Sequence, residues 1–348
     1  MNDSNTEDRD VYIGVDLHKR YSTVVRKNRQ GEVLAQSRVD HTPAAVAEFV
    51  KSLDADCHVA VEATGNWYYF YETVESSGAS VALCHPLKAR AIASARIVTD
   101  EFSADTLADL LRANLLPKAY IPDRETRDLR ELLRYRAALV GMTTQVRCRL
   151  RAILSKNGID CQHKDILGPS GRRFLAAAAL RNNYRLEVDG YCRIGQHLLA
   201  ETERIQALID QQAQLDERAR LLDTIPGVGP YTALLVLAEI GDINRFPTPG
   251  HLASYAGLVP SVHASGGHTR LGHITKQGSR WLRWILVECW WKLIGKSARF
   301  RRFYDRISAK HGAKAARIAV ARKLVHVIYR ILKERVPYRE NGTAPASS

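Results

Sequence analysis

Short apolar runs separated by turn-like stretches fill the first third of the chain. Residues 11–15 ("VYIGV"), 57–65 ("CHVAVEATG") and 80–86 ("SVALCHP") are rich in apolar and β-branched residues, and each predicts a short strand. Between the first two, residues 21–39 form two half-alternating stretches around "RQGE", a turn signal that predicts a strand–turn–strand unit.

Amphipathic segments alternate with these strands. Residues 42–53 begin with Thr42 as a helix N-cap and Pro43 as the first helical residue, which is the preferred order at a helix start. A second helix is expected over 66–78 and a third over 99–116. Three antiparallel strands followed by alternating strands and helices predict a mixed α/β domain, which we place at residues 1–122.

The pattern changes to long helices after the proline-containing stretch 115–123. Leu, Ala and Val recur at three- to four-residue spacing among arginines over 124–157, which predicts paired long helices and is compatible with an intermolecular coiled coil. Residues 160–190 show no clear pattern, and another helix is expected over 191–219. We assign 123–217 to a helical or coiled-coil region that either mediates dimerisation or separates two domains.

The last region begins with residues 221–241, "LLDTIPGVGPYTALLVLAEIG", which resemble a helix-hairpin-helix. In that motif glycines let backbone amides approach a phosphate at a helix N-terminus, although such turns also serve packing alone. Residues 263–278 are Gly-, Ser- and His-rich and too polar for a core, and basic helices follow to about residue 335. We therefore expect a mainly α C-terminal domain over 218–335 and a disordered tail over 336–348.

Composition excludes several classes of protein. The chain of 348 residues is 45% hydrophobic and 25% charged, as in globular proteins. No apolar run approaches the roughly 18–20 residues of a membrane span, and the acidic, polar N-terminus is unlike a signal peptide. Six cysteines without a CxxC pair argue against a zinc site or a disulfide framework and predict a cytoplasmic protein.

Positive charge is concentrated near the C-terminus. The net charge is +14, and residues 263–335 hold 18 Lys and Arg against 3 Asp and Glu, a local charge of +15. Such a concentration is typical of nucleic-acid binding, and a solvated basic face or an acidic protein partner is the alternative.

Three acidic residues that lie far apart in the sequence share one kind of position. Asp16 follows the first strand, Glu62 lies at the end of another strand, and Asp100 begins a helix. RNase H-like nucleases gather carboxylates in this way to hold Mg²⁺, which prefers oxygen ligands and can clamp both oxygens of a phosphodiester exchange.

Ser265 in "HASGGHTR" is a candidate nucleophile. Two glycines follow it, and Arg270, Lys276 and nearby histidines could neutralise a phosphate, a setting that a weakly nucleophilic hydroxyl needs. A phosphate-contacting Ser-Gly turn is the alternative. Three other serines are competing candidates: Ser254, Ser261 and Ser279.

Four histidines of the same region do not have the spacing of a zinc site: His251, His263, His268 and His273.

Five collinear segments give the chain a resemblance to one family. They are "YIGVDLHKR", "VAVEATGNWYY", "TDEFSADTLADLLRANLLPKAYIP", "TIPGVGPYTALLVLAEIGDINRF" and "LASYAGLVPSVHASGGHTRLGHITKQGSRWLRW". The chain resembles the DEDD-type transposases of insertion-sequence family 110, which are similar to the Piv DNA invertases.

The resemblance implies a RuvC-like (RNase H-like) domain, a helical coiled-coil segment and a C-terminal transposase domain with a serine. It also implies a homo-oligomer, either a dimer or a tetramer, in which the acidic site of one protomer meets the serine of another. The serine links covalently to DNA, and a noncoding bridge RNA specifies the donor and target DNA. The residues that match are Asp16, Glu62, Asp100 and Ser265.

The chain departs from the family at one position. The family pattern is Thr-Asp-x-x-Asp-Ala-x-Thr-Leu-Ala, and this chain has Ser103 at its second aspartate. Asp105 lies five residues after Asp100, ~140° around a helix of about 3.6 residues per turn, and is poorly placed to substitute. Three carboxylates helped by Ser103 or water, an impaired site, and a rearrangement that brings in Asp105 are the three possibilities.

These observations predict a Mg²⁺-dependent, RNA-guided DNA transposase or recombinase that is cytoplasmic and associates with the nucleoid when active. Asp16, Glu62 and Asp100 would bind the metal with Ser103 at the fourth position, and Ser265 would be the nucleophile. DNA or RNA phosphates would contact the residues Arg270, Lys276, Arg280 and Arg283. The alternatives are a metal-dependent Holliday-junction-type nuclease, a DNA invertase, and a catalytically weak DNA- and RNA-binding relative.

Overall fold

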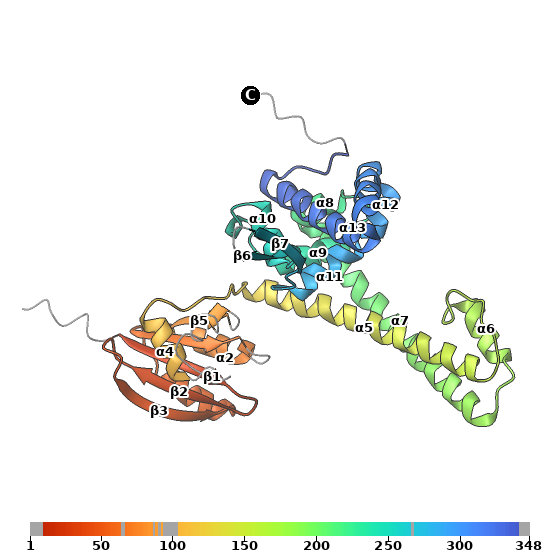
Figure 1. Cartoon of the computed structure of the whole chain (residues 1–348). Helices are drawn as coiled ribbons and strands as arrows, with labels where there is room; N and C mark the ends of the chain where they lie inside the picture. The colour runs from red at the N-terminus through yellow and green to blue at the C-terminus, as the bar shows by residue number, and fades with distance from the viewer. Residues whose placement is uncertain are drawn as a thin grey trace, which may run out of the picture. The chain divides into compact units, whose positions relative to one another are not determined.

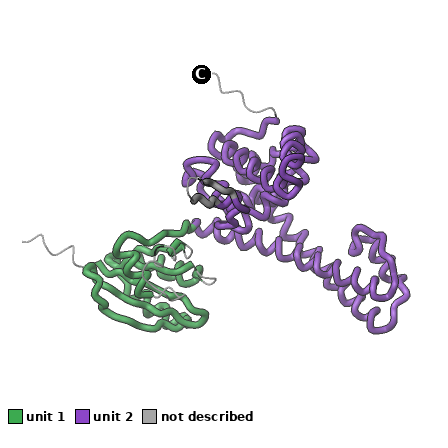
Figure 2. The backbone as a smooth tube through the Cα atoms, viewed as in Figure 1, with its two compact units in different colours: residues 1–121 green, residues 122–348 purple. Residues whose placement is uncertain are grey.

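Five strands of the N-terminal part pair into one sheet in the order β3-β2-β1-β4-β5. The computed structural model describes residues 10–63, 67–85, 88–89, 92, 104–265 and 268–340, and of residues 262–271 it describes the backbone alone. These residues form two compact units, 1–121 and 122–348 (Figure 2). The elements of unit 1 are β1 Val11–Leu17, β2 Tyr21–Lys27, β3 Val33–Asp40, α1 Pro43–Lys51, β4 Cys57–Glu62, α2 Trp67–Glu75, β5 Ser80–Cys84 and α4 Ala104–Arg112.

The predicted mixed α/β domain is confirmed. β1, β2 and β3 pair antiparallel, whereas β4 pairs parallel to both β1 and β5. Thr42 caps α1 as the sequence predicts, since its side chain accepts a hydrogen bond from the amide of Ala45, and Pro43 is the first helical residue. The parallel pairs matter for function because they bring the carboxyl ends of β1, β4 and β5 to one edge of the sheet.

The two faces of the sheet have separate cores. Alternate β1 residues, Ile13, Val15 and Leu17, belong to a cluster that includes Phe49 of α1 and Phe70 of α2. On the opposite face, Ala60 and Cys84 pack with residues of α4. Because side chains alternate along a strand, Gly14 and Asp16 of β1 lie on the face that α4 covers.

The expectation of a helix over 99–116 is only partly met. The described helix, α4, ends at Arg112, and residues 93–103 lie outside the described residues. Asn114 adopts a φ of 52°, its amide donates to Leu111 O, and the amide of Leu115 donates to Leu110 O. These two bonds form a Schellman motif that satisfies the last carbonyls, so the helix ends before the predicted residue 116.

Unit 2 is mostly helical, with a single two-stranded sheet among its described residues (Figure 1). Its elements are α5 Arg124–Lys156, α6 Pro169–Ala177, α7 Asn182–Leu215, α8 Glu217–Asp223, α9 Pro230–Ile240, the 3-10 helix η1 Ile243–Arg245, α10 Pro249–Tyr255, β6 Pro260–Ser265, β7 His268–Ile274, α11 Arg280–Glu288, α12 Trp290–Lys296 and α13 Ala298–Glu334. None of the helices in the described ranges is both long and apolar enough to cross a bilayer.

The two long helices, α5 and α7, pack against each other within one chain (Figure 1). At the end of this helical pair, Leu150 and Leu154 of α5 meet Leu175 of α6 and Val188 of α7 in a small core. The stretch 160–190 therefore contains α6 and the start of α7, which the sequence pattern did not predict. The intermolecular coiled coil stays a prediction, because the pairing seen here is intramolecular.

The rest of unit 2 surrounds a larger core built from α7 to α13, into which Leu133 and Leu139 of α5 also pack. Arg130 of α5 is buried, and its guanidinium donates to the carbonyls of Ala238 at 2.7 Å and Glu239 at 3.2 Å. A cation at the C-terminal end of a helix satisfies the last carbonyls and complements the dipole. This contact fixes α5 to the end of α9.

The polar segment after residue 260 forms a hairpin, whose two strands the sequence analysis did not predict. β6 and β7 pair antiparallel, and Ser265 and His268 form the last Cα pair before the connection. The polar composition hid these strands, although Gly-Gly between two short runs is itself a signal for a tight hairpin.

Candidate active site and nucleic-acid interface

Asp16 and Glu62 lie on neighbouring parallel strands at equivalent positions. The register of β1 and β4 pairs Gly14 with Ala60 and Val15 with Val61, so the next residues along both strands are Asp16 and Glu62. Because Gly14 and Ala60 face α4, their second neighbours along each strand face the same side. The structure thus brings together two of the three acids that the sequence singled out.

Asp16 is mostly buried, with 17% of its side chain exposed, and its Oδ2 lies 3.2 Å from Nε2 of His18. The ring of His18 in turn packs 4.6 Å from that of Tyr21, centroid to centroid. His18 directly follows β1 and contacts Asp16. The sequence analysis did not single out this histidine.

Glu62 lies opposite Cys84 of β5 in the sheet register. Burial raises the pKa of the Cys84 thiol to about 12, and the negative charge of Glu62 adds to this shift. The register therefore places Glu62 beside the last residue of β5. The thiol is therefore protonated at neutral pH and contributes no thiolate to the edge.

His85, directly after β5, is a residue that the sequence reasoning missed. Its amide donates to Pro117 O at 2.8 Å, while its Nδ1 is buried and has no hydrogen-bond partner within the described part of the chain. Burial, with Lys88 nearby, lowers its pKa, so the ring is neutral at pH 7. The available signal was its place in the sequence, since His85 is a polar residue directly after the apolar run of the strand that ends at Cys84.

The described part of helix α4 begins over Gly14, in the middle of β1. A Cβ on Gly14 would lie 1.8 Å from the carbonyl oxygen of Ala104 and 2.7 Å from the amide nitrogen of Ala108, so only glycine permits this contact. Further along α4, Asp105 and Asp109 each lie 2.8 Å from the buried ammonium of Lys27. The register pairs Lys27 with Tyr12, towards the start of β1, so α4 runs antiparallel to β1 and begins nearer the carboxyl edge.

The remaining predicted metal ligands, Asp100 and Ser103, lie outside the described residues. Asp105 faces Lys27, which gives this carboxylate a structural role in holding α4 on the sheet. Within the described ranges, no group of three or more His, Cys, Asp and Glu side chains is placed to hold a metal ion. Asp16 and Glu62 nevertheless supply the hard oxygen donors that suit Mg²⁺, so the described residues fit such an ion as part of its ligand set.

Ser265 ends β6, and the backbone register pairs it with His268, while Arg270 pairs with His263. Both predicted residues thus belong to the hairpin. The segment after β7 has two residues with positive φ, Lys276 at 54° and Gly278 at 92°. A Cβ on Gly278 would lie 2.0 Å from Tyr255 O.

The two other predicted phosphate contacts differ in their surroundings. The side chain of Arg280 is exposed, with its guanidinium 5.6 Å from the ring centre of Trp281. The guanidinium of Arg283 instead donates to Ala256 O at 3.2 Å and Lys276 O at 3.0 Å. Arg283 therefore holds the backbone at the base of the hairpin.

The competing serine Ser279 has a structural role. Its hydroxyl caps α11 by accepting from the amide of Leu282 at 3.1 Å and donates to the carboxylate of Glu239 at 2.8 Å. Glu239 is almost fully buried and also pairs with Arg134 of α5 at 2.8 Å. The sequence analysis missed this network, for which a charged residue inside the apolar run "ALLVLAEIG" was the available signal.

The turn between α8 and α9 contains the predicted glycine-rich motif. Gly227 has a φ of 86°, and Gly229 precedes Pro230 at the start of α9. The turn lines a pocket together with Lys292 and Lys296 of α12 and with the acidic Asp223.

Comparison with known protein families gives one match in the N-terminal part of the chain and one in the C-terminal part. Residues 13–157 match the DEDD-type transposase family of IS110, described as "Transposase", and residues 219–305 match the "Transposase IS116/IS110/IS902 family". The chain belongs to the IS110-type transposase family. Such transposases cleave and recombine DNA, which makes this member an enzyme that acts on DNA.

Its relatives include transposases and DNA-inverting proteins. A putative transposase of Sinorhizobium fredii is 26% identical over 94% of this chain and 89% of its own length. The transposase of the insertion sequence element IS1111A of Coxiella burnetii is 26% identical over 94% and 91%. A pilin gene-inverting protein of Moraxella bovis is 36% identical over 39% of this chain and 43% of its own.

Proposed function

We propose that this IS110-type transposase is a Mg²⁺-dependent DNA recombinase of a mobile insertion sequence that uses Ser265 as its nucleophile. The observation that carries the proposal is the adjacent placement of Asp16 and Glu62 on the face that α4 covers. This arrangement has the character of a RuvC-like acidic site, to which Asp100 would add the third carboxylate.

Asp16, Glu62 and Asp100 would hold the ion. Bound Mg²⁺ would neutralise and polarise the scissile phosphodiester. The hydroxyl oxygen of Ser265 would form a new ester bond to phosphorus while the bond to one strand end breaks. That end leaves as a hydroxyl and takes up the serine's proton through solvent, so the phosphodiester energy is retained for rejoining.

Three further elements of the proposal rest on family membership. A bridge RNA would specify the donor and target DNA, and the protein would act as a dimer or tetramer. The acidic site of one protomer would meet the serine of another. A fourth element rests on charge: the basic C-terminal helices would hold the phosphates of DNA and RNA, with a strong dependence on salt.

The decisive experiment traps the covalent intermediate. Protein, Mg²⁺, cognate RNA and labelled DNA are incubated, denatured and separated, and a protein–DNA adduct is expected with the wild type. Ser265→Ala should abolish it, while Ser261→Ala, a matched change on the same strand, should leave it intact. Asp16→Asn and Glu62→Gln should lower adduct formation at least about 100-fold.

The alternatives give different products. Nicked DNA without an adduct would indicate a metal-dependent nuclease that uses water, with Ser265 only contacting phosphate. DNA and RNA binding without either product would indicate a catalytically weak relative. In that case Ser103→Asp, which restores the family's acid, should recover activity, and failure to do so would contradict the importance of that position.

A further inference from the structure

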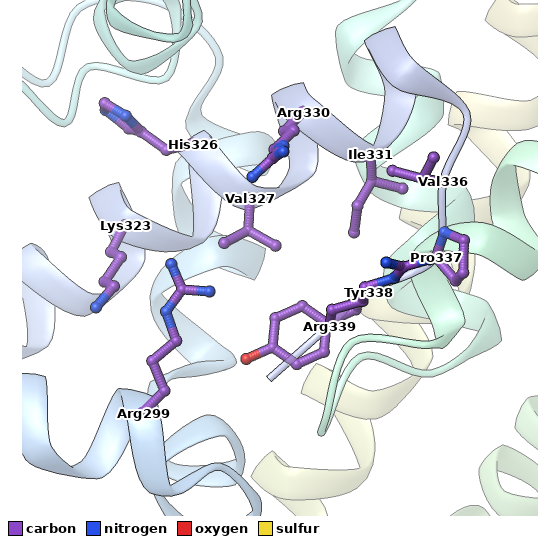
Figure 3. A pocket seen from close by; sticks show the side chains of 10 residues that line it. All are labelled: Arg299, Lys323, His326, Val327, Arg330, Ile331, Val336, Pro337, Tyr338 and Arg339. Carbon is purple, nitrogen blue, oxygen red and sulfur yellow. The ribbon is translucent and has the colours of Figure 1, made fainter. Parts of the chain in front are cut away.

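A small pocket in unit 2 lies between two parts of helix α13 and the chain that follows it (Figure 3). The helix contains a kink at Gly312, where φ is 78° and ψ is 164°. Residues from before and after the kink line the pocket, together with the segment after the helix: Arg299, Lys323, His326, Val327, Arg330, Ile331, Val336, Pro337, Tyr338 and Arg339.

The chain after α13 is fixed in place by one carboxylate. Glu340 accepts hydrogen bonds from the hydroxyl of Ser297 at 2.8 and 3.0 Å, from the amide of Arg299 at 2.8 Å and from the hydroxyl of Tyr338 at 2.8 Å. The amide of Tyr338 also donates to Oγ1 of Thr224 at 2.8 Å. The carboxylate is thus engaged by three donors that build the wall of the pocket.

The lining contains many cations and no acid. Arg330 pairs with Glu334 at 2.9 Å on the exposed side of the helix. Within the described parts of the chain, neither the guanidinium of Arg299 nor the ammonium of Lys323 lies within salt-bridge distance of a carboxylate. Figure 3 shows the Arg299 side chain extending towards Val327, between the side chains of Lys323 and Tyr338.

The positive charge at this pocket is strong enough to affect Lys323. Burial lowers its pKa, and Arg299, Arg306 and Arg302 lower it further, while Glu340 opposes them. Those three arginines are spaced three and four residues apart, so they share one face of the helix. Glu340 is one counter-charge against several cations. Repulsion among the cations raises the free energy of the protein, and a bound anion relieves it.

We propose that this pocket binds a backbone phosphate of the nucleic acid on which the transposase acts. Its volume, about 200 Å³, is below the ~300–1,000 Å³ of typical small-molecule sites, which favours one phosphate group over a whole nucleotide. The row of arginines on the same helix face continues the positive charge beyond the pocket. A strand with phosphates in succession matches that row better than a single free anion does.

The proposal deepens the proposed function, on which it rests for the identity of the ligand, and a binding measurement tests it without catalysis. Fluorescein-labelled mixed-sequence oligonucleotides, as single-stranded DNA, duplex DNA and RNA, are titrated with the full chain at several salt concentrations in the absence of Mg²⁺. The variant Lys323→Gln removes one phosphate partner. Lys310→Gln, an exposed change on the same helix, is the matched control.

Lys323→Gln should weaken binding and reduce the slope of log K against log salt by about 0.9 for duplex DNA or about 0.7 for a single strand. The oligonucleotide that shows the larger change identifies the strand type that enters the pocket. Arg299→Gln should have a similar effect, and Lys310→Gln should leave the slope unchanged. Lys323→Gln should also melt no earlier than the wild type, because it removes a repelled charge.

Two results would overturn the proposal. An unchanged salt slope in Lys323→Gln and Arg299→Gln would show that no phosphate of the strand enters the pocket. An equal decrease in Lys310→Gln would show a diffuse positive surface rather than a site. If the slope changes as expected but no serine adduct forms in the trapping assay, the pocket stands and the recombinase chemistry fails; the reverse pattern leaves the chemistry standing and rejects the pocket.

Discussion

The buried carboxylate of Glu239 accepts a 2.8 Å hydrogen bond from the hydroxyl of Ser279, the residue that caps α11. The other oxygen of Glu239 lies 2.8 Å from the guanidinium of Arg134. One acid on α9 therefore joins the long helix α5 to the start of α11, next to the base of the hairpin that holds Ser265. Its position makes the placement of the candidate nucleophile dependent on α5.

Glu239→Gln should destabilise the protein by about 2–4 kcal/mol. The amide keeps one acceptor, but its NH₂ group faces a donor, and the guanidinium of Arg134 loses its buried counter-charge. The midpoint of urea unfolding, followed by tryptophan fluorescence, measures the change. Glu131, the exposed second partner of Arg134, offers the control: Glu131→Gln should cost less than about 1 kcal/mol. Equal effects of the two changes would show that the buried contact has no special weight.

Lys27 should stabilise unit 1 in a manner that depends on pH. Burial lowers its pKa, but hydrogen bonds and ion pairs with Asp105 and Asp109 outweigh burial and raise it above 10.5. The folded state thus holds the proton more tightly than the unfolded chain. The stabilisation is complete below pH 10.5 and is lost as the pH rises through the folded pKa.

Lys27→Met should therefore lower the unfolding free energy by about 1–2 kcal/mol at neutral pH, a discounted value because both partner acids are about half exposed. The difference from wild type should shrink above pH 10.5, as measured by urea unfolding followed by circular dichroism. Lys51→Met, at an exposed position, should show neither effect. A difference that stays constant with pH would show that the ion pairs do not contribute.

Gly14→Ala tests the contact between β1 and α4. The new Cβ would lie 1.8 Å from the carbonyl oxygen of Ala104, so α4 must move. Overpacking of this kind costs about 1–3 kcal/mol or more, and adduct formation should fall because the start of α4 moves relative to Asp16. Gly141 lies within α5 with open space around it, so Gly141→Ala should instead stabilise by up to about 1 kcal/mol. A Gly14→Ala variant with unchanged stability and activity would show that this close approach is unimportant.

The sequence predicted most of unit 1, because each strand and helix there carries a local signal. The apolar run at 11–15 predicts β1, and Thr42 with Pro43 predicts the start of α1. The sequence alone could not predict that Asp16 and Glu62 are adjacent, because this follows from the register of β1 and β4, which depends on long-range pairing. The end of α4 was missed although Asn114 was an available signal, since Asn is, after Gly, a residue that adopts the left-handed conformation at the end of a helix.

In unit 2 the features that the sequence did not predict were missed for different reasons. The hairpin that contains Ser265 has polar strands without an alternating pattern, so periodicity did not predict them. The Glu239 network depends on α5, α9 and α11 meeting in space. Charge alone predicted phosphate contacts for both Arg280 and Arg283 and did not distinguish their roles. The backbone carbonyls around Arg283 and the exposure of Arg280 distinguish the two.

Arg280 and Arg283 should therefore respond differently to the same change. Arg283→Gln loses two hydrogen bonds to backbone carbonyls and should lower the unfolding free energy by about 1–2 kcal/mol. Arg280→Gln, at an exposed position, should leave stability within about 0.5 kcal/mol and reduce the salt slope of DNA binding by about 0.9. Urea unfolding and fluorescence anisotropy on the same two preparations measure both quantities. Loss of DNA binding in Arg283→Gln without loss of stability would show that Arg283 contacts the nucleic acid directly, as the charge pattern alone suggests.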